Sequence, residues 1–259
     1  MSPIQTQLQN NIGTITMNNP ERRNTLSSTA VDEILQALEV LEKGKARVII
    51  LRAQAGASVW SAGHDVSELP QAGRDPLSYN DPLVTVLRSI QECPLPVIAM
   101  IEGGVWGGAC DLALSCDILI GSPSASFTMT PAKIGVPYNA SGILHFLGIM
   151  GINIAKEMFF SAQSLSAERA EKLGILNHLV PVSDLERFTG DLAEKIAANS
   201  PLSIRVIKEQ IRLLSNAHPL SPHTFERVQG LRRLVYDSND YAEGINAFFE
   251  KRKAVFQGS

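Results

Sequence analysis

The sequence predicts an α/β core followed by a helical C-terminal region. Segments typical of strands alternate with amphipathic segments up to about residue 140, and helical patterns dominate afterwards. The chain has 259 residues, of which 44% are hydrophobic and 19% are charged, so it can bury a substantial core. We therefore expect a core over residues 1–190 and a helical region over residues 191–259.

The first elements have the clearest patterns. Residues 4–8 and 12–17 are predicted to form a hairpin, because they are partly alternating apolar segments on either side of Asn10-Asn11. After the loop NNPERRN, Ser27 or Ser28 can cap a helix whose apolar residues recur every three or four positions up to Leu41. The run VIIL at residues 48–51 predicts a strand that is buried on both faces.

The same order of strands and helices continues through the middle of the chain. The predicted elements are a helix over 82–91, a strand over 96–101, a glycine-rich turn, a helix over 108–115, and strands over 118–120 and 126–129. Beyond these, we expect helices over 166–173, 183–199, 201–214, 222–236 and 241–251, with one further strand over 178–182.

Composition excludes several classes of protein. A formal charge of -3 gives no general attraction to nucleic acid or to an anionic membrane. The most apolar stretch, residues 97–120, is interrupted by Glu102, Asp111 and Asp117, so it does not read as a membrane span. The N-terminus lacks a basic segment followed by an apolar one, and three cysteines are too few for a disulfide scaffold. We expect a soluble cytoplasmic protein with reduced thiols and no metal site.

Two glycine-containing segments are candidates for a functional site. Residues 61–65, SAGHD, follow a strand-like segment, and residues 102–109, EGGVWGGA, follow a predicted strand and open a helix. Each alone is typical of a tight turn. Together they favour a site, because glycine lets the backbone approach a ligand closely and two converging N–H groups would form an oxyanion hole. No GxGxxG, GxxxxGK[ST] or GxSxG motif is present.

The chain resembles the crotonase (enoyl-CoA hydratase/isomerase) superfamily. The segments that carry the resemblance are VIILRA, SAGHD, PVIAMIEGGVWGGACDLALSCDILI and SASFTMTPAKIGVP, followed by LSAERAEKLGILNHLVP, SPLSIRVIKEQIR and NAFFEKRKAVF. The resemblance implies a spiral of ββα turns with a C-terminal helical trimerisation region, assembled as a homotrimer or a dimer of trimers. It also implies an acyl-CoA thioester substrate whose enolate oxygen is bound by the backbone amides of His64 and Gly108.

Hydratases of this family use two glutamates, and neither is present. One position holds Asp111, and the other, directly after Pro131, holds Ala132, which cannot move a proton. The segment GVPYN, together with SAGHDVSELP, GRDPLSYNDPL, VWGGA, FTMTP and VYDSNDY, resembles the decarboxylases of this superfamily that convert methylmalonyl-CoA to propionyl-CoA and CO2. The resemblance implies that this reaction proceeds without biotin or a metal.

Decarboxylation leaves an enolate, so its main requirements are an oxyanion hole and a carboxylate held perpendicular to the thioester plane. The hydroxyl of Tyr138 can hold that carboxylate by a hydrogen bond, and Ala132, Val136 and Pro137 would form an apolar lining. We take His64, Gly108 and Tyr138 as catalytic. The expected substrate-binding residues are Ala62, Gly63, His64, Asp65, Val66, Gly108, Thr130, Tyr138 and Lys251, the last for the CoA phosphates.

Other interpretations stay open at this point. Asp111 could serve an enoyl-CoA hydratase or isomerase, or simply complement the dipole of its helix. Tyr138 could pack at a turn, and Lys251 could belong to a solvated helix end. A non-catalytic RNA-binding relative would need a basic surface with aromatic side chains, whereas the basic residues here are dispersed. Ethylmalonyl-CoA and malonyl-CoA remain possible substrates.

Overall fold

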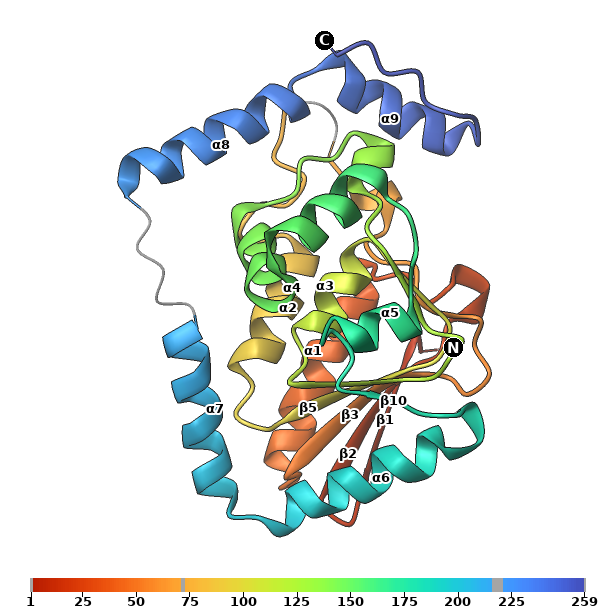
Figure 1. The fold of residues 1–259 in the computed structure, drawn as a ribbon, viewed down its shortest axis with the longest axis vertical. Helices are drawn as coiled ribbons and strands as arrows, with labels where there is room; N and C mark the ends of the chain where they lie inside the picture. Colours follow the sequence, from red (N-terminus) through yellow and green to blue (C-terminus); the bar gives the residue numbers. More distant parts are fainter. Residues whose placement is uncertain (1, 71–72, 216–220, 259) are drawn as a thin grey trace.

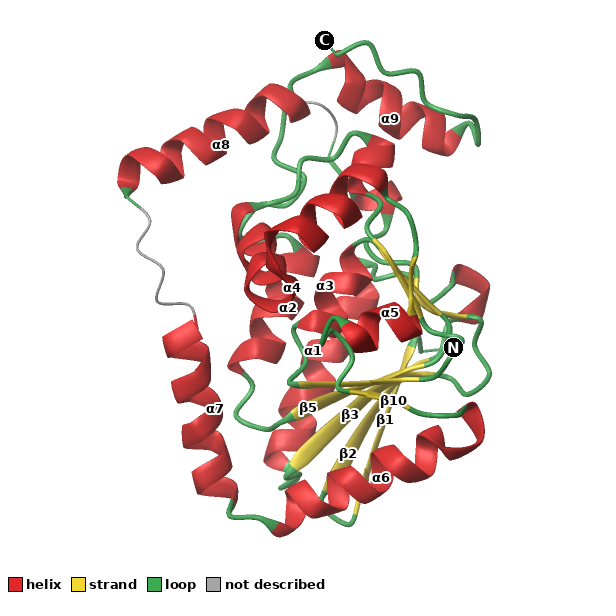
Figure 2. Cartoon of the chain, in the orientation of Figure 1, coloured by secondary structure: helices red, strands yellow, loops and turns green. Residues whose placement is uncertain are grey.

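The structure, a computed structural model, describes residues 2–70, 73–215 and 221–258. It contains two sheets with helices on both sides of the larger one (Figures 1 and 2). The larger sheet has the strand order β1 (Ile4–Gln9), β2 (Ile12–Met17), β3 (Val48–Ala53), β5 (Val97–Ile101), β7 (Ile118–Gly121) and β10 (His178–Leu179). The smaller sheet has the order β4 (Val59–Ser61), β6 (Gly104–Trp106), β8 (Ser126–Thr128) and β9 (Leu165–Ser166).

Successive turns of the chain form a spiral. Each turn places one strand in the larger sheet, the next strand in the smaller sheet, and then a helix. The first turn runs through β3, β4 and α2 (Pro82–Glu92), the second through β5, β6 and α3 (Gly108–Leu114), and the third through β7, β8 and α4 (Ala140–Ser161). Strands of adjacent turns pair in parallel, as in the registers Ile49 with Val97 and Gly104 with Ser126. The predicted spiral of ββα turns is confirmed.

The N-terminal elements form as their local signals predict. Asn10 and Asn11 adopt positive φ angles of 51° and 62°, which a two-residue hairpin turn requires, and the antiparallel pair β1–β2 follows. Ser27 caps α1 (Ser28–Lys43) by accepting a 3.3 Å hydrogen bond from the Ala30 N–H. The apolar stripe of α1, which includes Ile34 and Leu41, is buried in the core.

The larger sheet separates two apolar layers. On one face, α1 to α4 and α5 (Ala167–Lys172) enclose the main core with residues such as Ile49 and Ala99. On the other face, α6 (Val182–Ala198) covers Val48, Ile98 and Ile120 (Figure 1). Strands covered on both faces read as continuous apolar runs, which explains the VIIL pattern. The predicted division at residues 190 and 191 falls within α6.

The last three helices lie beside the α/β core and across one end of it. In Figure 1, α7 (Pro201–Ser215) lies to the left of the core, and α8 (Pro222–Tyr236) and α9 (Asn239–Phe249) lie across the top. Arg232 of α8 forms a buried ion pair with Asp75, and the hydroxyl of Tyr241 in α9 donates a 2.7 Å hydrogen bond to the Pro70 carbonyl. Both contacts hold the loop between β4 and α2 from the C-terminal side.

Several elements differ from the sequence-based expectation: β6 lies in the predicted glycine-rich turn, β9 was not predicted, and β10 and α4 differ most. The strand predicted over residues 178–182 is only the two-residue β10, because Pro181 lacks an N–H and starts α6. Helix α4 was not predicted, since its 22 residues are apolar nearly all round and give no periodic stripe. By length and composition alone α4 could cross a membrane. Gly151 interrupts it with φ 74°, and Phe146, Met150 and Met158 pack into the core.

Candidate active site

A cavity of about 550 Å³ lies where the two glycine-containing segments meet. Most of its wall is apolar. Its lining residues come from the loop before α1, from residues 62–66, from the start of α2, from residues 106–108 and 130–138, and from Phe248 of α9. Elements from three turns of the spiral therefore contribute to one site.

The backbone N–H of His64 points away from Leu26, the residue that it pairs with in the neighbouring segment. Leu26 forms an isolated parallel bridge with His64: the Leu26 N–H donates to the Gly63 carbonyl at 2.8 Å, and the Leu26 carbonyl accepts from the Asp65 N–H at 3.4 Å. In a parallel bridge, the residue between those two partners directs its own N–H to the opposite side. The His64 N–H therefore remains available to a ligand, and His64 lines the cavity.

The Gly108 amide lies beside it. Gly107 ends the segment after β6 with φ 53°, and Gly108 begins α3, so its N–H belongs to the first turn and has no acceptor within the helix. A Cβ atom placed on Gly63 would lie 2.8 Å from the Gly108 nitrogen, and one placed on Gly108 would lie 3.4 Å from the His64 nitrogen. Two such adjacent donors on one cavity wall have the arrangement of an oxyanion hole.

Tyr138 lines the same cavity, with its hydroxyl bound to a buried carboxylate. The hydroxyl donates a 2.8 Å hydrogen bond to Asp111 Oδ2, and His145 Nδ1 lies 2.7 Å from Asp111 Oδ1. Burial, followed by the neighbouring charge of Asp111, raises the pKa of Tyr138 well above its usual value, so the hydroxyl keeps its proton. Asp111 and His145 line a second cavity of about 510 Å³, next to α2 and α4. Neither residue is among those that line the first cavity.

The cavity brings together most of the residues that the sequence singled out. Its lining includes Ala62, His64, Asp65, Val66, Gly108, Thr130 and Tyr138. Gly63 lies behind this wall, and its backbone (φ 83°) contacts the Gly108 segment. Lys251 is exposed beyond the end of α9 and does not line the cavity, so its role toward CoA phosphates stays a prediction.

The expected apolar lining is only partly correct. Val136 lines the cavity, but Ala132 is exposed on the short helix η3 (Pro131–Ile134), and neither it nor Pro137 is a lining residue. Other apolar residues of the lining include Leu77, from the loop before α2, Leu83 of α2 and Phe248 of α9. A sequence pattern could not place that loop, since its apolar residues have no period.

Charged side chains gather at the same cavity. Arg22, Arg23 and Lys133 are lining residues, and the turn-rich loop NNPERRN is the sequence signal that could have identified the first two. Arg22 also forms a 3.3 Å ion pair with Asp65. Within the ranges that the structure describes, no three His, Cys, Asp or Glu side chains are grouped to hold a metal ion.

Comparison with known proteins places the chain in a family. The family model for enoyl-CoA hydratase/isomerase matches residues 7–259. The chain is 49% identical over 249 residues to the methylmalonyl-CoA decarboxylase of Escherichia coli (strain K12), which covers 96% of this chain and 95% of that protein. It is 30% identical over 248 residues to the mitochondrial enoyl-CoA hydratase of Pongo abelii, covering 96% of this chain and 84% of the relative.

Solved structures agree with this placement. Methylmalonyl-CoA decarboxylase in complex with 2-nitronate-propionyl-CoA superposes with a TM-score of 0.97 at 48% identity, covering 99% of this chain and 98% of that one. The same enzyme complexed with 2S-carboxypropyl CoA also gives a TM-score of 0.97, at 47% identity, covering 100% and 99%. The chain belongs to the enoyl-CoA hydratase/isomerase family.

Proposed function

We propose that this protein catalyses the decarboxylation of methylmalonyl-CoA to propionyl-CoA and CO2. The observation that carries the proposal is the pair of adjacent amides of His64 and Gly108 in a largely apolar cavity that also contains Tyr138. Similarity to the Escherichia coli decarboxylase over 96% of the chain supports the same reaction.

The reaction requires the electrons of one C–C bond to move into the thioester. As the bond between C2 and the carboxylate breaks, CO2 departs and the electron pair forms an enolate whose negative charge lies mainly on the thioester oxygen. The amides of His64 and Gly108 donate to that oxygen, and each such donor is worth about 3 kcal/mol of transition-state stabilisation. One proton from solvent then adds to C2 and gives propionyl-CoA.

Tyr138 is suited to orient the departing carboxylate. Its ring packs edge-on against Phe146, at a centroid distance of 6.2 Å, and at a tilt against Phe159, at 5.3 Å. The hydroxyl reaches the substrate by turning from Asp111, which keeps His145 as a partner when it does. Holding the C–COO bond perpendicular to the thioester plane aligns it with the π system that accepts its electrons.

Hydration of an enoyl-CoA has less support. Asp111, the one acid at a glutamate position of the hydratases, is bound by Tyr138 and His145 on both carboxylate oxygens and lies outside the lining of the first cavity. The other position holds Ala132, which is exposed. A general acid and base must reach the reacting atoms within hydrogen-bond distance, and neither position supplies one.

Products from two substrates test the proposal. The purified protein would be incubated separately with methylmalonyl-CoA and with crotonyl-CoA after dialysis against a chelator, and the products would be followed by mass. We expect propionyl-CoA from the first and unchanged crotonyl-CoA from the second. Rapid hydration of crotonyl-CoA with unchanged methylmalonyl-CoA would overturn the proposed reaction. The chelator step tests whether the reaction proceeds without a metal ion.

We further propose that the chain assembles as a homotrimer or a dimer of trimers through the C-terminal helices. Helix α7 exposes Leu202, Val206 and Ile211, and α8 exposes Leu231 and Leu234, an amount of apolar surface that is unusual for a free monomer. Light scattering coupled to size-exclusion chromatography distinguishes three or six subunits from one.

A further inference from the structure

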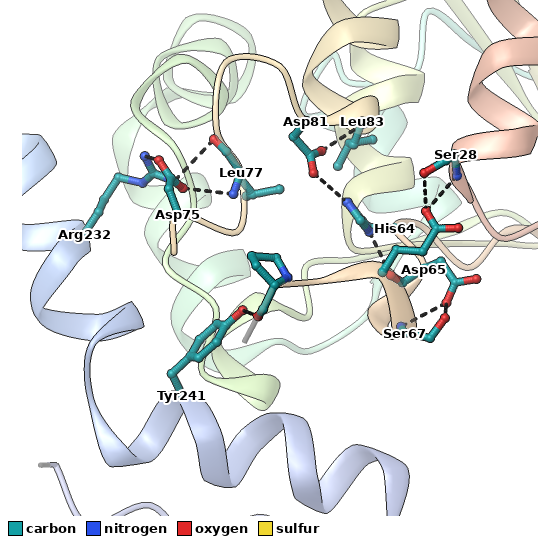
Figure 3. Close-up of polar contacts among 12 residues, drawn as sticks. Ser28, His64, Asp65, Ser67, Asp75, Leu77, Asp81, Leu83, Arg232 and Tyr241 are labelled. Carbon is teal, nitrogen blue, oxygen red and sulfur yellow. Dashed lines mark hydrogen bonds and ion pairs between the residues drawn. The ribbon is translucent and has the colours of Figure 1, made fainter. Parts of the chain in front are cut away.

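The side chain of His64 lies between two hydrogen-bond acceptors. Its Nδ1 is 3.0 Å from the Asp65 carbonyl, and its Nε2 is 3.1 Å from Asp81 Oδ2 (Figure 3). Both side chains of the His64–Asp81 pair are only 10–11% exposed. The contact joins residues 17 positions apart: His64 follows β4, and Asp81 directly precedes α2.

This geometry sets the protonation state of the ring. A backbone carbonyl only accepts hydrogen bonds, so Nδ1 carries a proton. Asp81 Oδ1 accepts a 2.9 Å hydrogen bond from the Leu83 N–H at the start of α2, where an ionised carboxylate is favoured by the helix dipole. Nε2 therefore donates to an ionised carboxylate and also carries a proton. With both nitrogens protonated, His64 is an imidazolium.

The pair also connects two walls of the cavity. Its histidine carries the backbone amide that lies beside Gly108, and its aspartate caps α2. Leu83, two residues after Asp81, lines the cavity, and a Cβ atom on Gly108 would lie 2.5 Å from its Cδ2. His64 lines the cavity and Asp81 does not, so Asp81 acts on the site through the histidine.

We propose that Asp81 is a positioning residue of the reaction: it holds the His64 ring as an imidazolium, and this fixes the peptide that carries the oxyanion donor. The inference rests on the proposed function. Loss of the proton from the ring removes one of the two hydrogen bonds and the positive charge, so the oxyanion hole loses both its anchor and a favourable field.

The charges around the ring favour this state. Burial lowers the pKa of His64. The hydrogen bond and the charge of Asp81 raise it, and together with smaller contributions they outweigh the effect of burial, so the net shift is upward from 6.5. Glu68 adds to the upward shift from the short helix η2 (Val66–Glu68) and is held by the Ser28 N–H and hydroxyl at 2.7 Å. The other titratable groups on this wall and across the cavity are Asp65 with its partner Arg22, Glu21, Arg23, Lys133 and Tyr138.

The consequence is an alkaline limit on activity. A pKa raised above 6.5 keeps the imidazolium to a higher pH than in an ordinary histidine, and the imidazolium is lost as the pH rises through the raised pKa. We therefore expect kcat/KM to fall on the alkaline side, by about tenfold per pH unit beyond the midpoint, since one proton is released.

The direct test is an NMR titration of the protein labelled at histidine Cε1, without substrate. The His64 signal is identified by its absence from His64→Gln. We expect its midpoint to lie above 6.5 in the wild type. In Asp81→Asn, which keeps the helix cap but removes the charge, we expect the midpoint to fall by about one pH unit or more. Asp184→Asn, at the exposed first turn of α6, is the control and leaves it unchanged.

The same variants are then compared by the pH dependence of kcat/KM with methylmalonyl-CoA. The alkaline limb is expected to coincide with the titration in the wild type, to move to lower pH in Asp81→Asn, and to be absent in His64→Gln. A merely structural role for Asp81 would lower activity without moving the limb. A His64 midpoint at or below 6.5, equal midpoints in wild type and Asp81→Asn, or a limb that persists in His64→Gln would each overturn the inference. A titration as expected without any decarboxylation would instead overturn the proposed reaction, and with it the role of the pair in catalysis.

Discussion

The hydroxyl of Tyr138 donates a 2.8 Å hydrogen bond to Asp111, and this bond links the wall of one cavity to the wall of another. Tyr138 lines the cavity that contains the amides of His64 and Gly108, whereas Asp111 and His145 line the neighbouring one. The acid that a hydratase would need is therefore occupied in holding a tyrosine. This arrangement favours decarboxylation, which needs no base, over hydration, which needs one.

Replacement of Asp111 by asparagine distinguishes the two reactions. Asparagine keeps the shape and can still pair with Tyr138 or His145, but it cannot act as a base. We expect Asp111→Asn to retain kcat/KM for methylmalonyl-CoA within about tenfold, whereas loss of a general base costs about a hundredfold or more. Steady-state kinetics on protein shown to be folded by circular dichroism measures this. A loss of a hundredfold would mean that Asp111 takes part in the chemistry.

Gly63 is required by two separate constraints, and a matched pair of variants separates them. Its φ is 83°, and a Cβ atom there would lie 2.4 Å from the Trp106 carbonyl oxygen and 2.8 Å from the Gly108 nitrogen. Gly56 has a similar φ of 76° with nothing within 4 Å of its Cβ position. We expect Gly63→Ala to lower kcat by about a hundredfold, because it displaces the Gly108 amide. Gly56→Ala introduces the same backbone strain without a steric clash, and we expect it to leave kcat unchanged. Equal losses of kcat in the two variants would mean that backbone strain, and not displacement of the Gly108 amide, causes the loss.

Tyr138→Phe removes the hydroxyl that we propose orients the substrate carboxylate. Hydrogen bonds to charged groups contribute about 1.5–3 kcal/mol, so we expect kcat/KM to fall by about tenfold to a hundredfold. The variant also leaves one oxygen of buried Asp111 without its donor, which is expected to cost about 1–3 kcal/mol of stability. Kinetics and urea unfolding measure the two effects. Tyr79, which is 72% exposed, provides the control: Tyr79→Phe should change neither kcat/KM nor stability. If Tyr138→Phe had the kcat/KM of the wild type, Tyr138 would have no part in the mechanism.

The buried ion pair between Arg232 and Asp75 is expected to stabilise the loop over the cavity. Arg232 is 6% exposed, and its guanidinium binds both Asp75 oxygens. The Asp75 side chain is 26% exposed, so removal of its partner leaves a charge that is only partly screened by solvent, and Arg232→Met should lower the free energy of unfolding by about 2 kcal/mol. Arg169→Met removes an exposed pair with Glu157 and should have little effect. Urea unfolding compares them, and equal losses would show that burial of the Arg232 pair does not matter.

Sequence patterns predicted the elements whose signals are local. The hairpin at Asn10-Asn11, the Ser27 cap and the buried strand β3 each depend on neighbouring residues, and their positions were predicted to within two residues. Helix α4 was missed because it is apolar on most sides and broken at Gly151, so no stripe distinguishes it.

In the site, too, features with a local sequence signal were predicted and contacts between distant residues were not. The two glycine-containing segments were identified because strand-to-helix turns have a recognisable pattern, and Tyr138 was identified by resemblance. The contact of His64 with Asp81 was missed, since nothing periodic relates two polar residues 17 positions apart. Ala132 and Pro137 were expected in the lining as apolar residues, but the turn into η3 leaves Ala132 exposed to solvent.

If the amides of His64 and Gly108 stabilise an enolate, the protein binds an enolate-like anion more tightly than a neutral thioester. The nitronate of 2-nitronate-propionyl-CoA carries a negative charge conjugated with the thioester carbonyl, as the enolate does, whereas propionyl-CoA is neutral at that position. Isothermal titration calorimetry of the wild-type protein with both ligands gives the ratio of their Kd values. We expect the nitronate to bind at least about a hundredfold more tightly, because the site is complementary to the anion. Equal Kd values for the two ligands would contradict an oxyanion hole at these amides.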